Sequence, residues 1–362
     1  MTNQLINQSF NQFQADAFAE QLLDILNNGA LSLMISLGHR TGLFDALASL
    51  PPATSQEIAE KSGLQERYVR EWLRLNAMVV GHIINYDSET KTYHLPAEHA
   101  AFLTQAASSN NMASLAQFIP VLAQVEEQIV DCFYHGGGVP YAQYNRFHEV
   151  MAEDSSKSIV MVLEDQILPL IPNLVHLLNR GIDVLDVGCG QGCALNQMAA
   201  LFPQSRFTGY DLCPDVIAKA IEEAKSRQLS NVRFHIKDAV KIDEVEQYDL
   251  ISTFDAIHDQ ARPDWVLKNI YRALRPNGVY LMQDIHAATE VSGNLAHPLA
   301  PLLYTISCMH CMTVSLAAGG LGLGAMWGQE KALELIEEAG FDQIEVKQLS
   351  HDFQNDYYII RK

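Results

Sequence analysis

The sequence predicts an α/β protein with a doubly wound, mostly parallel seven-stranded sheet and an N-terminal α-helical winged-helix domain. From residue 182 onward, short apolar runs typical of strands alternate with helical patterns, as in sheets covered by helices on both faces. The first of these runs, 183–187, leads into glycines at every second position, Gly188, Gly190 and Gly192. Within residues 1–105, two short helices followed by a hairpin predict the winged helix.

The chain length favours more than one domain. At 362 residues it is long for a single core. We expect a helical dimerisation and winged-helix domain over 1–105, bridging helices over 106–156, and the cofactor-binding sheet domain over 157–362. The formal net charge of −19 disfavours a nucleic acid as the main partner, because such binding depends on Lys and Arg neutralising phosphates.

The sequence also indicates a compartment. No stretch reaches the roughly 18 to 20 uninterrupted apolar residues that span a bilayer. The first residues lack the basic and apolar regions of a signal peptide. Six cysteines in a chain of this size do not suggest a disulfide framework. We therefore expect a cytoplasmic protein that does not enter a membrane.

The first helices predict an interface. Over residues 10–50 the apolar side chains form a surface too wide for one solvated helix; they are Leu22, Leu23, Ile25, Leu26, Leu31, Leu33, Met34 and Leu37. A second copy of the chain that covers this surface would make a homodimer, which we favour. Burial against the rest of the same chain is the alternative.

The winged-helix pattern follows. Thr54 and Glu57 have capping-box spacing, residues 65–79 form the next helix, and 82–86 with 92–95 form a hairpin. Such a domain invites a DNA-binding interpretation. However, residues 1–105 contain six Lys or Arg against eleven Asp or Glu, a net charge of −5, so no basic patch is expected.

The bridging region is expected to line the ligand cleft. Residues 110–134 predict one long helix that contains Pro120, and three glycines at 136–138 predict a flexible break. Segments that cross between domains often border the cleft. Phe147 and Met151 are therefore placed near a bound cofactor, with ordinary packing as the alternative.

The sheet domain is predicted strand by strand. Strands are expected at 183–187, 206–210, 232–236, 248–253 and 278–283, with helices after each of the first four. Residues 341–349 and 357–361 predict the two closing strands. Ligands of such sheets bind at the carboxyl ends of the strands.

The glycine loop restricts the cofactor. A dinucleotide site would have its third glycine three residues after the second, whereas Gly192 follows Gly190 by two. Asp186, just before the loop, is unfavourable beside a pyrophosphate. Charge complementarity instead predicts a ligand with a cationic end near Asp186.

Two more aspartates follow the next strands. Asp211 ends the second strand, where a carboxylate can accept both ribose hydroxyls of a nucleoside. Asp238 follows the third strand and is placed to accept an exocyclic adenine amine. Each is individually unremarkable, since strand-end aspartates often only cap turns, but their joint placement indicates a nucleoside site.

These motifs resemble a known family. DVGCGQG, then YD in RFTGYDLCPDVI, KDA after NVRFHI, YDLISTFDAIHD and ALRPNGVYLM are similar to the ordered motifs of class I S-adenosylmethionine-dependent methyltransferases over about residues 180–350. The start of the chain resembles the dimerisation domain of small-molecule O-methyltransferases. The whole chain is similar to a bacterial group of winged-helix methyltransferases.

The resemblance implies roles for individual residues. Asp186, Gly188 and Gly190 would hold the methionine end of S-adenosylmethionine, whose product is S-adenosylhomocysteine. Asp211 would bind the ribose. The remaining implied contacts are Leu212 beside the adenine, Asp238 and Ala239 on the adenine, and Phe254 with Asp255 near the transferred methyl group.

His258 is the catalytic candidate. The resemblance implies that a His-Asp pair after the fourth strand supplies the general base, and His258 with Asp259 stands there. An ordinary imidazole, with a pKa near 6.5, suits this task at neutral pH. Gln260 departs from the family, which usually has Trp, and this puts the substrate in doubt. A packing or capping role for His258 is the alternative.

A final apolar stretch, 302–316, is expected to border the acceptor. Within it Tyr304, Met309 and His310 are candidate contacts, and the Cys308–Cys311 pair favours packing over half a zinc site, so no metal site is expected. The glycine-rich residues 319–324 predict a mobile lid before Trp327, a further acceptor contact.

The sequence thus predicts methyl transfer from S-adenosylmethionine to a small molecule, at oxygen, with His258 as general base. The alternatives are transfer to nitrogen or carbon, a cofactor-sensing DNA-binding regulator, and a catalytically silent binding module.

Overall fold

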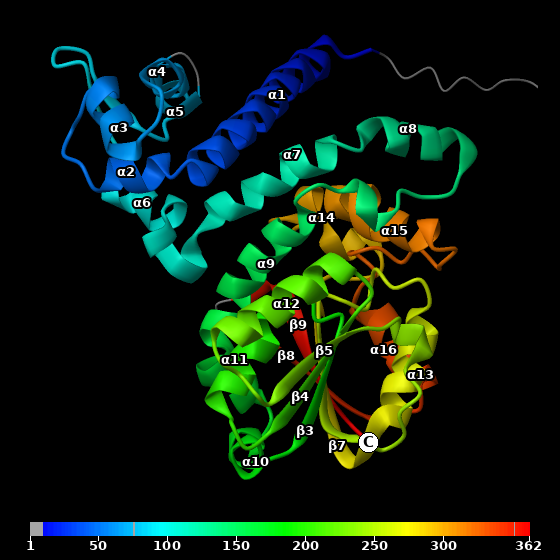
Figure 1. Cartoon of the computed structure of the whole chain (residues 1–362). Helices are drawn as coiled ribbons and strands as arrows, with labels where there is room; N and C mark the ends of the chain where they lie inside the picture. Colours follow the sequence, from blue (N-terminus) through cyan, green and yellow to red (C-terminus); the bar gives the residue numbers. More distant parts are fainter. Residues whose placement is uncertain (1–9, 75–76, 351) are drawn as a thin grey trace, which may run out of the picture. The chain divides into compact units, whose positions relative to one another are not determined.

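The computed structural model describes residues 10–74, 77–350 and 352–362 of the chain. It divides into two compact units, Met1–Ile119 and Pro120–Lys362. Each unit has its own core, and each is described by itself (Figure 1).

The first unit contains the expected helices and hairpin. Its elements are α1 (Gln12–Arg40), α2 (Leu43–Ala48), α3 (Ser55–Ser62), α4 (Glu66–Arg74), α5 (Ala77–Val80), β1 (Asn85–Asp87), β2 (Thr92–His94) and α6 (Ala97–Leu103). The predicted capping box is confirmed, because the Thr54 side chain accepts from the Glu57 N–H and the Glu57 carboxylate accepts from the Thr54 N–H. Phe44 and Trp72 pack edge to face in its core.

The helix expected over 65–79 is interrupted. α4 ends at Arg74 and α5 begins at Ala77, with residues 75–76 outside the described part of the chain. On α4, Arg67 pairs with Glu71 and Arg70 pairs with Glu66, each one turn away. These arginines are therefore already neutralised within their own helix.

The single helix predicted over 110–134 is wrong. The structure has η1 (Gln105–Asn110), η2 (Met112–Gln117), α7 (Phe118–Ala123) and α8 (Glu126–His135). Pro120 lies in the first turn of α7, where a missing N–H is tolerated. The helical path breaks at Val125, whose φ of −109° and ψ of 10° are not helical.

The second unit holds the sheet. Its order is β5-β4-β3-β6-β7-β9-β8, from strands β3 (Asp183–Val187), β4 (Arg206–Asp211), β5 (Val232–Ile236), β6 (Tyr248–Phe254), β7 (Leu274–Ile285), β8 (Gln343–Leu349) and β9 (Asp352–Arg361). Only β9 runs antiparallel to its neighbours β7 and β8. The chain order reverses at β3, so a crevice is expected beyond its carboxyl end.

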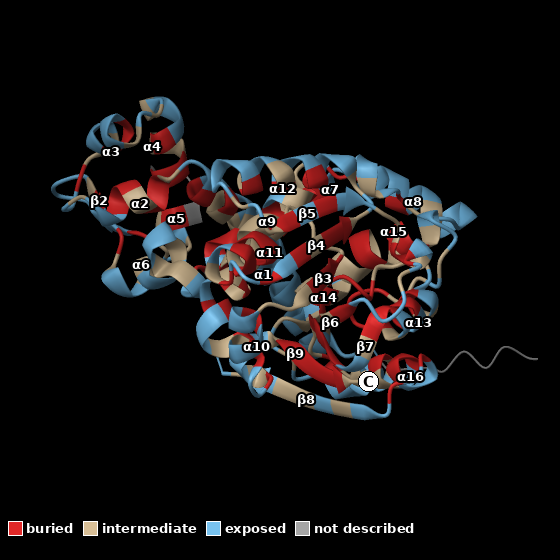
Figure 2. Ribbon diagram, turned by 60° about the horizontal axis from the view of Figure 1, so that its bottom comes forward, coloured by how far each residue is buried: buried red, intermediate tan, exposed pale blue. Residues whose placement is uncertain are grey.

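Helices cover both faces of the sheet (Figures 1 and 2). On one face α10 (Leu174–Arg180), α11 (Cys193–Leu201) and α12 (Pro214–Ser226) pack through residues such as Leu178, Leu195 and Ile217. On the other, α13 (Pro263–Ala273) and α16 (Gln329–Glu338) pack through Leu267 and Ile336. The predicted doubly wound sheet is confirmed.

One predicted crossover helix is wrong. The connection from β5 to β6 contains only η7 (Ala239–Lys241), a single 3₁₀ turn capped by the Asp238 side chain. Ten residues separate Lys237 from Tyr248, too few for a helix and both of its loops.

The second unit contains further helical segments. They are η3 (Tyr141–Gln143), α9 (Phe147–Ser158), η4 (Val160–Val162), η5 (Leu163–Ile167), η6 (Leu168–Leu170), η8 (Val291–Asn294), α14 (Ala300–Ile306), η9 (Ser307–Cys311) and α15 (Met312–Ala317). Of these, α9, α14 and α15 are drawn near the carboxyl edge of the sheet (Figure 1). η9 is a π-helical turn, a form that concentrates at functional sites.

One straight helical run is long and apolar enough to cross a membrane by length and composition. It is Ala300–Ala317; a second candidate is the pair Phe147–Leu170 and Leu174–Arg180, bent by 107°. Core helices pass the same test, and Leu303, His310 and Val314 of the straight run are buried.

Candidate functional site

The glycine loop begins at the carboxyl end of β3. Gly188, Gly190 and Gly192 all have positive φ, which non-glycine residues rarely adopt. A Cβ atom on Gly192 would lie 2.7 Å from the ring of Phe234, so this glycine allows β5 to approach the loop. A Cβ on Gly190 would meet no heavy atom within 4 Å. The loop is therefore packed on one side and open at Gly190.

Asp211 fastens this loop to β4. Its Oδ2 accepts the Gly190 N–H at 2.9 Å, and its Oδ1 accepts the Cys213 N–H at 2.9 Å. The Gly188 and Cys189 N–H groups donate to the Tyr210 carbonyl. Each Asp211 oxygen has a second lone pair, so the carboxylate can also accept hydroxyl groups.

Asp186 is a buried carboxylate without a cationic partner. Its Oδ1 accepts the Ser252 hydroxyl at 2.8 Å, from β6. Burial raises the pKa of Asp186 to about 7, the Ser252 hydrogen bond opposes this rise, and Asp211 adds to it. A cation beside Asp186 would restore the charged form.

Asp238, Ala239 and Leu212 are the predicted adenine contacts. The Asp238 Oδ1 accepts the Val240 N–H at 3.1 Å, and its Oδ2 lies 3.4 Å from Lys241 Nζ. Ala239 is buried, whereas Leu212 is 68% exposed. Leu212 directly follows β4, and Asp238 lies two residues beyond the end of the neighbouring parallel strand β5.

Asp255 follows Phe254 at the end of β6. It adopts a φ of 49°, a conformation that costs energy in a non-glycine residue and often marks functional sites. Its Oδ2 accepts from Gln283 Nε2 at 3.1 Å, while its Oδ1 has no partner. Burial, with the nearby Asp284 charge, raises the pKa of Asp255 to about 8.

His258 is paired with Asp284. The imidazole Nδ1 and Asp284 Oδ1 are 2.8 Å apart, and both side chains are buried. Trp327 Nε1 also donates to Asp284 Oδ1, at 3.0 Å. Asp284 thereby fixes the orientation of the imidazole, much as a carboxylate does in hydrolase triads.

The electrostatic state of His258 differs from the sequence expectation. Burial disfavours the imidazolium, but the Asp284 carboxylate and the Cys311 thiol, which hydrogen-bonds to the imidazole, outweigh that effect and hold the pKa of His258 well above its ordinary value. The expectation of an ordinary pKa is therefore wrong. A raised pKa keeps the imidazole protonated at neutral pH, so only its neutral fraction can accept a proton, and that fraction is a stronger base than an ordinary imidazole.

Sequence reasoning missed Asp284 and the role of Trp327 as its partner. Asp284 immediately follows the strand expected at 278–283, so the strand-end signal that identified Asp211 could have found it. Its pairing with His258 depends on β6 and β7 being neighbours, which the sequence alone does not state.

Residues 136–148, which we call the strap, lie against the same region. The Val139 N–H donates to Thr313 Oγ1 at 2.8 Å, and the Tyr144 hydroxyl donates to the Met309 carbonyl. Gln191 of the glycine loop donates to the His148 carbonyl at 3.0 Å. The strap is thus fastened both to the loop and to the η9–α15 segment.

Aromatic rings of the strap and α9 surround His310. Phe147 stacks on His310 at 3.5 Å between ring centroids, and Tyr141 and Tyr144 pack edge-on against it. Burial holds the pKa of His310 well below its ordinary value, so the ring is neutral. Burial and the carboxylates of Asp259 and Asp211 raise the pKa of Tyr141.

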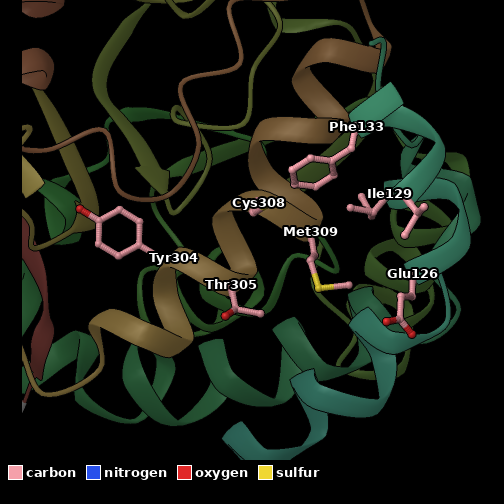
Figure 3. A pocket seen from close by; sticks show the side chains of 8 residues that line it. Glu126, Ile129, Phe133, Tyr304, Thr305, Cys308 and Met309 are labelled. Atoms are coloured by element: carbon pink, nitrogen blue, oxygen red, sulfur yellow. The ribbon is translucent and has the colours of Figure 1, made fainter. Parts of the chain in front are cut away.

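The expected acceptor contacts fall into separate groups. Phe147 and His310 pack together, whereas Trp327 is buried against Asp284. Tyr304 and Met309 line a different pocket, with a volume of about 440 Å³, between α8 and the α14–η9 run (Figure 3). Its other lining residues are Glu126, Ile129, Val130, Phe133, Thr305 and Cys308. Met151 lies half-buried in α9.

Two family models match the chain. A Methyltransferase domain matches residues 178–340, and an Rv2258c-like winged HTH domain matches residues 29–105. The first covers the glycine loop, the three strand-end aspartates and the His258–Asp284 pair.

Curated relatives match parts of the chain. It is 28% identical over 169 residues to malonyl-[acyl-carrier protein] O-methyltransferase of Bacillus cereus, covering 43% of this chain and 55% of that protein. It is 32% identical over 106 residues to trans-aconitate 2-methyltransferase of Deinococcus radiodurans, covering 28% and 36%. The chain thus spans about half the length of the first curated relatives it matches.

Solved structures match nearly the whole chain. Mitomycin 7-O-methyltransferase superposes with a TM-score of 0.71 at 19% identity, over 97% of this chain and 100% of that one. Human N-acetylserotonin methyltransferase, in complex with S-adenosylmethionine, gives 0.66 at 18% identity over 99% of both chains. The chain therefore combines a winged helix-turn-helix domain with an S-adenosylmethionine-dependent methyltransferase domain, in the fold of small-molecule O-methyltransferases.

Proposed function

We propose that this protein transfers the methyl group of S-adenosylmethionine to an oxygen of a small-molecule acceptor. The observation that carries the proposal is the buried His258–Asp284 pair, at 2.8 Å, just beyond the carboxyl ends of β6 and β7. The open glycine loop lies at the same edge of the sheet, beyond β3. The proposed base and the proposed cofactor site would therefore lie at the same carboxyl edge of the sheet.

The cofactor would be held by residues that the loop brings together. Asp186 would face the cationic methionine end, with Gly188 and Gly190 giving backbone access. Asp211 would accept the ribose hydroxyls, and Asp238 and Ala239, with Leu212, would contact the adenine. Phe254 and Asp255 would lie near the methyl group, and Met151 near the cofactor. The solvent-exposed Leu212 supports this role, because an exposed apolar side chain can cover an adenine.

The chemical step is an in-line displacement. The acceptor oxygen forms a bond to the methyl carbon as the carbon–sulfur bond breaks, and that electron pair stays on sulfur, giving the neutral thioether S-adenosylhomocysteine. His258 takes the hydroxyl proton, and Asp284 stabilises the resulting imidazolium. Holding both reactants together contributes about 7 to 11 kcal/mol, and a positioned base about 10² to 10⁴-fold.

The methyl acceptor would lie against the aromatic rings that surround His310. Phe147 and His310 with the strap would form one wall, and Tyr304 and Met309 the pocket beyond η9 (Figure 3). Trp327 would influence the site indirectly, because its indole N–H donates to Asp284, the partner of His258. We further propose that the protein is a cytoplasmic homodimer joined through its N-terminal domain.

Titration calorimetry with S-adenosylmethionine and S-adenosylhomocysteine tests the cofactor assignment, and no binding of either would refute it. Transfer of a labelled methyl group to a panel of phenols, anilines and carboxylic acids then tests the reaction. Products on aniline nitrogen alone would favour N-methylation. Cofactor binding without transfer to any acceptor would favour a silent module.

Replacement of His258 by Ala or Asn tests the base. We expect turnover to fall by about 10² to 10⁴-fold, the usual contribution of a general base. The affinity for S-adenosylhomocysteine is expected to remain that of the wild type, because His258 is assigned no cofactor contact. Unchanged turnover in both variants would contradict the assignment.

A DNA-binding regulator is the alternative from another class. The ion pairs of Arg67 and Arg70 within α4 argue against it. Salt-dependent retention of the protein on random duplex DNA would revive this alternative.

A further inference from the structure

Three side chains that can bind a metal converge at the ends of β6 and β7. Asp255, His258 and Asp284 each offer one ligand atom, and these atoms all lie within 4.8 Å of one another. Asp255 directly follows β6, and His258 lies three residues further along the chain. Asp284 is the next-to-last residue of the neighbouring strand β7. The group is therefore fixed by the sheet itself.

Two oxygens of this group are buried and find no hydrogen-bond partner among the residues that the structure describes. Asp284 Oδ1 accepts from His258, Trp327 and the Ile285 N–H, yet its Oδ2 accepts nothing, although Asp284 is fully buried. Asp255 Oδ1 is likewise unpartnered. Buried polar atoms almost always have partners, so two unpartnered carboxylate oxygens in one cluster indicate a missing group.

A cation is the group that best suits these two carboxylate oxygens. Within the described residues, no Lys or Arg forms an ion pair with Asp255 or Asp284. The donors that reach the two carboxylates are Gln283, Trp327, the Ile285 N–H and His258, and all of them serve the other oxygens.

The donor set indicates the kind of cation. One imidazole nitrogen and two carboxylate oxygens suit zinc, which commonly takes three protein ligands and leaves a fourth position open. Magnesium prefers six oxygens in near-ideal octahedral geometry and is disfavoured. Zinc lies about 2.0 to 2.2 Å from such ligands, so small side-chain rotations would close a cluster of this width.

We propose that Asp255, His258 and Asp284 form a binding site for a zinc ion. The ion would take the unpartnered oxygens Asp255 Oδ1 and Asp284 Oδ2 and replace the hydrogen bond between His258 and Asp284. The sequence predicts no metal site, and this proposal departs from that expectation. An imidazole bound to zinc cannot accept a proton, so zinc would also inhibit methyl transfer; this consequence, unlike the binding, rests on the proposed function.

Metal binding can be measured in the absence of any methyl acceptor. The full chain is stripped with a chelator and dialysed, then titrated with zinc alone by calorimetry and with cobalt alone by visible absorption. We expect one ion per chain, with cobalt bands typical of four or five ligands. Metal analysis after gel filtration should return the same stoichiometry.

The variants Asp255→Asn and His258→Gln each remove one ligand. We expect either change to weaken zinc binding by more than the about 10 to 100-fold that loss of a merely supporting residue costs. Asp259→Asn is the matched control, because Asp259 is a neighbouring carboxylate outside the cluster, and it should bind zinc as the wild type does. Thermal unfolding followed by circular dichroism in each variant reports whether the second unit is folded.

Two results would overturn the proposal. One is that neither zinc nor cobalt binds at one ion per chain. The other is binding that persists in both folded ligand variants, which would place the ion elsewhere, for example at Cys308. Neither result bears on methyl transfer by the metal-free protein, so the failure of this proposal and of the proposed function are distinguishable.

Discussion

Asp186 links pH to cofactor binding. Its carboxyl has a pKa of about 7 because it is buried without a cation; Asp211, Cys189 and Tyr280 are the titratable groups coupled to it. A cationic ligand binds the ionised form, so protons compete with the cofactor. We expect the affinity for S-adenosylmethionine to rise about tenfold from pH 6 to pH 8, the change expected when a group with this pKa must ionise.

Calorimetric titrations across this range measure the effect. In Asp186→Asn the competing proton is absent, so the affinity should be lower and nearly independent of pH between 6 and 8. A wild-type affinity that stays constant across the range would show that Asp186 does not face the cationic end.

At the residue scale, local motifs were predictable and spatial partners were not. Asp186 and Asp211 lie at the carboxyl ends of β3 and β4, and the glycines follow β3, so their shared edge could be inferred from alternation alone. Asp284 reaches His258 from 26 residues away, and Ser252 reaches Asp186 from 66. Such pairs depend on which strands are neighbours and on side-chain direction, which spacing does not encode.

Among the elements, α3 begins with a capping box whose contribution can be measured. Thr54 accepts the Glu57 N–H, which would otherwise lack a partner in the first turn. We expect Thr54→Ala to reduce the stability of the first unit by about 1 kcal/mol, the usual effect of losing a cap. Thr54→Asn retains a capping side chain and should unfold close to the wild-type temperature. Equal losses in the two variants would contradict a capping role.

The strap contacts the glycine loop through one hydrogen bond. Gln191 Nε2 donates to the His148 carbonyl, and Gly136 and Gly137 have positive φ at the start of the strap. We expect S-adenosylhomocysteine to slow amide exchange over residues 136–148, because a ligand on the loop stabilises this contact.

Hydrogen exchange with and without S-adenosylhomocysteine measures this effect. In Gln191→Ala the added protection of the strap should largely disappear, while protection of the β3 amides should remain. Identical exchange of the strap in both states of the wild type would show that the two segments are independent.

Element boundaries were predictable where a cap or a glycine fixes them. Thr54 and Gly63 enclose α3, and the alternation pattern located β3 and β5 to the residue. The helix expected over 110–134 failed because an apolar period continues across Val125 although the backbone there leaves the helical region. Packing, not the local pattern, determines such a break.

For the whole molecule, α1 carries the prediction of a dimer. Leu23 and Leu26 are 61% and 68% exposed, and exposed apolar surfaces of this extent mark interfaces. We expect the Leu23→Glu, Leu26→Glu double variant to be monomeric by light scattering, because charges cannot be buried there without partners. Val245→Glu, at an equally exposed position of the second unit, should leave the assembly unchanged. A monomeric wild type would refute the dimer.

The architecture of the whole chain could be predicted further than its substrate. The order of strands and helices determines a doubly wound sheet, and the glycine loop locates its ligand edge. The proposed acceptor contacts come from three helical segments: Phe147 from α9, Tyr304 from α14, and Met309 and His310 from η9. Their positions depend on how the strap and η9 pack together, and this packing cannot be predicted from the spacing of apolar residues in the sequence.

The contact between Gln191 and His148 would couple the cofactor and acceptor sites proposed above. A cofactor that favours the loop conformation in which Gln191 reaches the strap would also favour a strap held against the loop, and by reciprocity a strap held there would raise the affinity for the cofactor. An acceptor admitted before the cofactor would meet a strap without that support. If the proposed function is right, we therefore expect an order of binding in which S-adenosylmethionine enters first and S-adenosylhomocysteine leaves last.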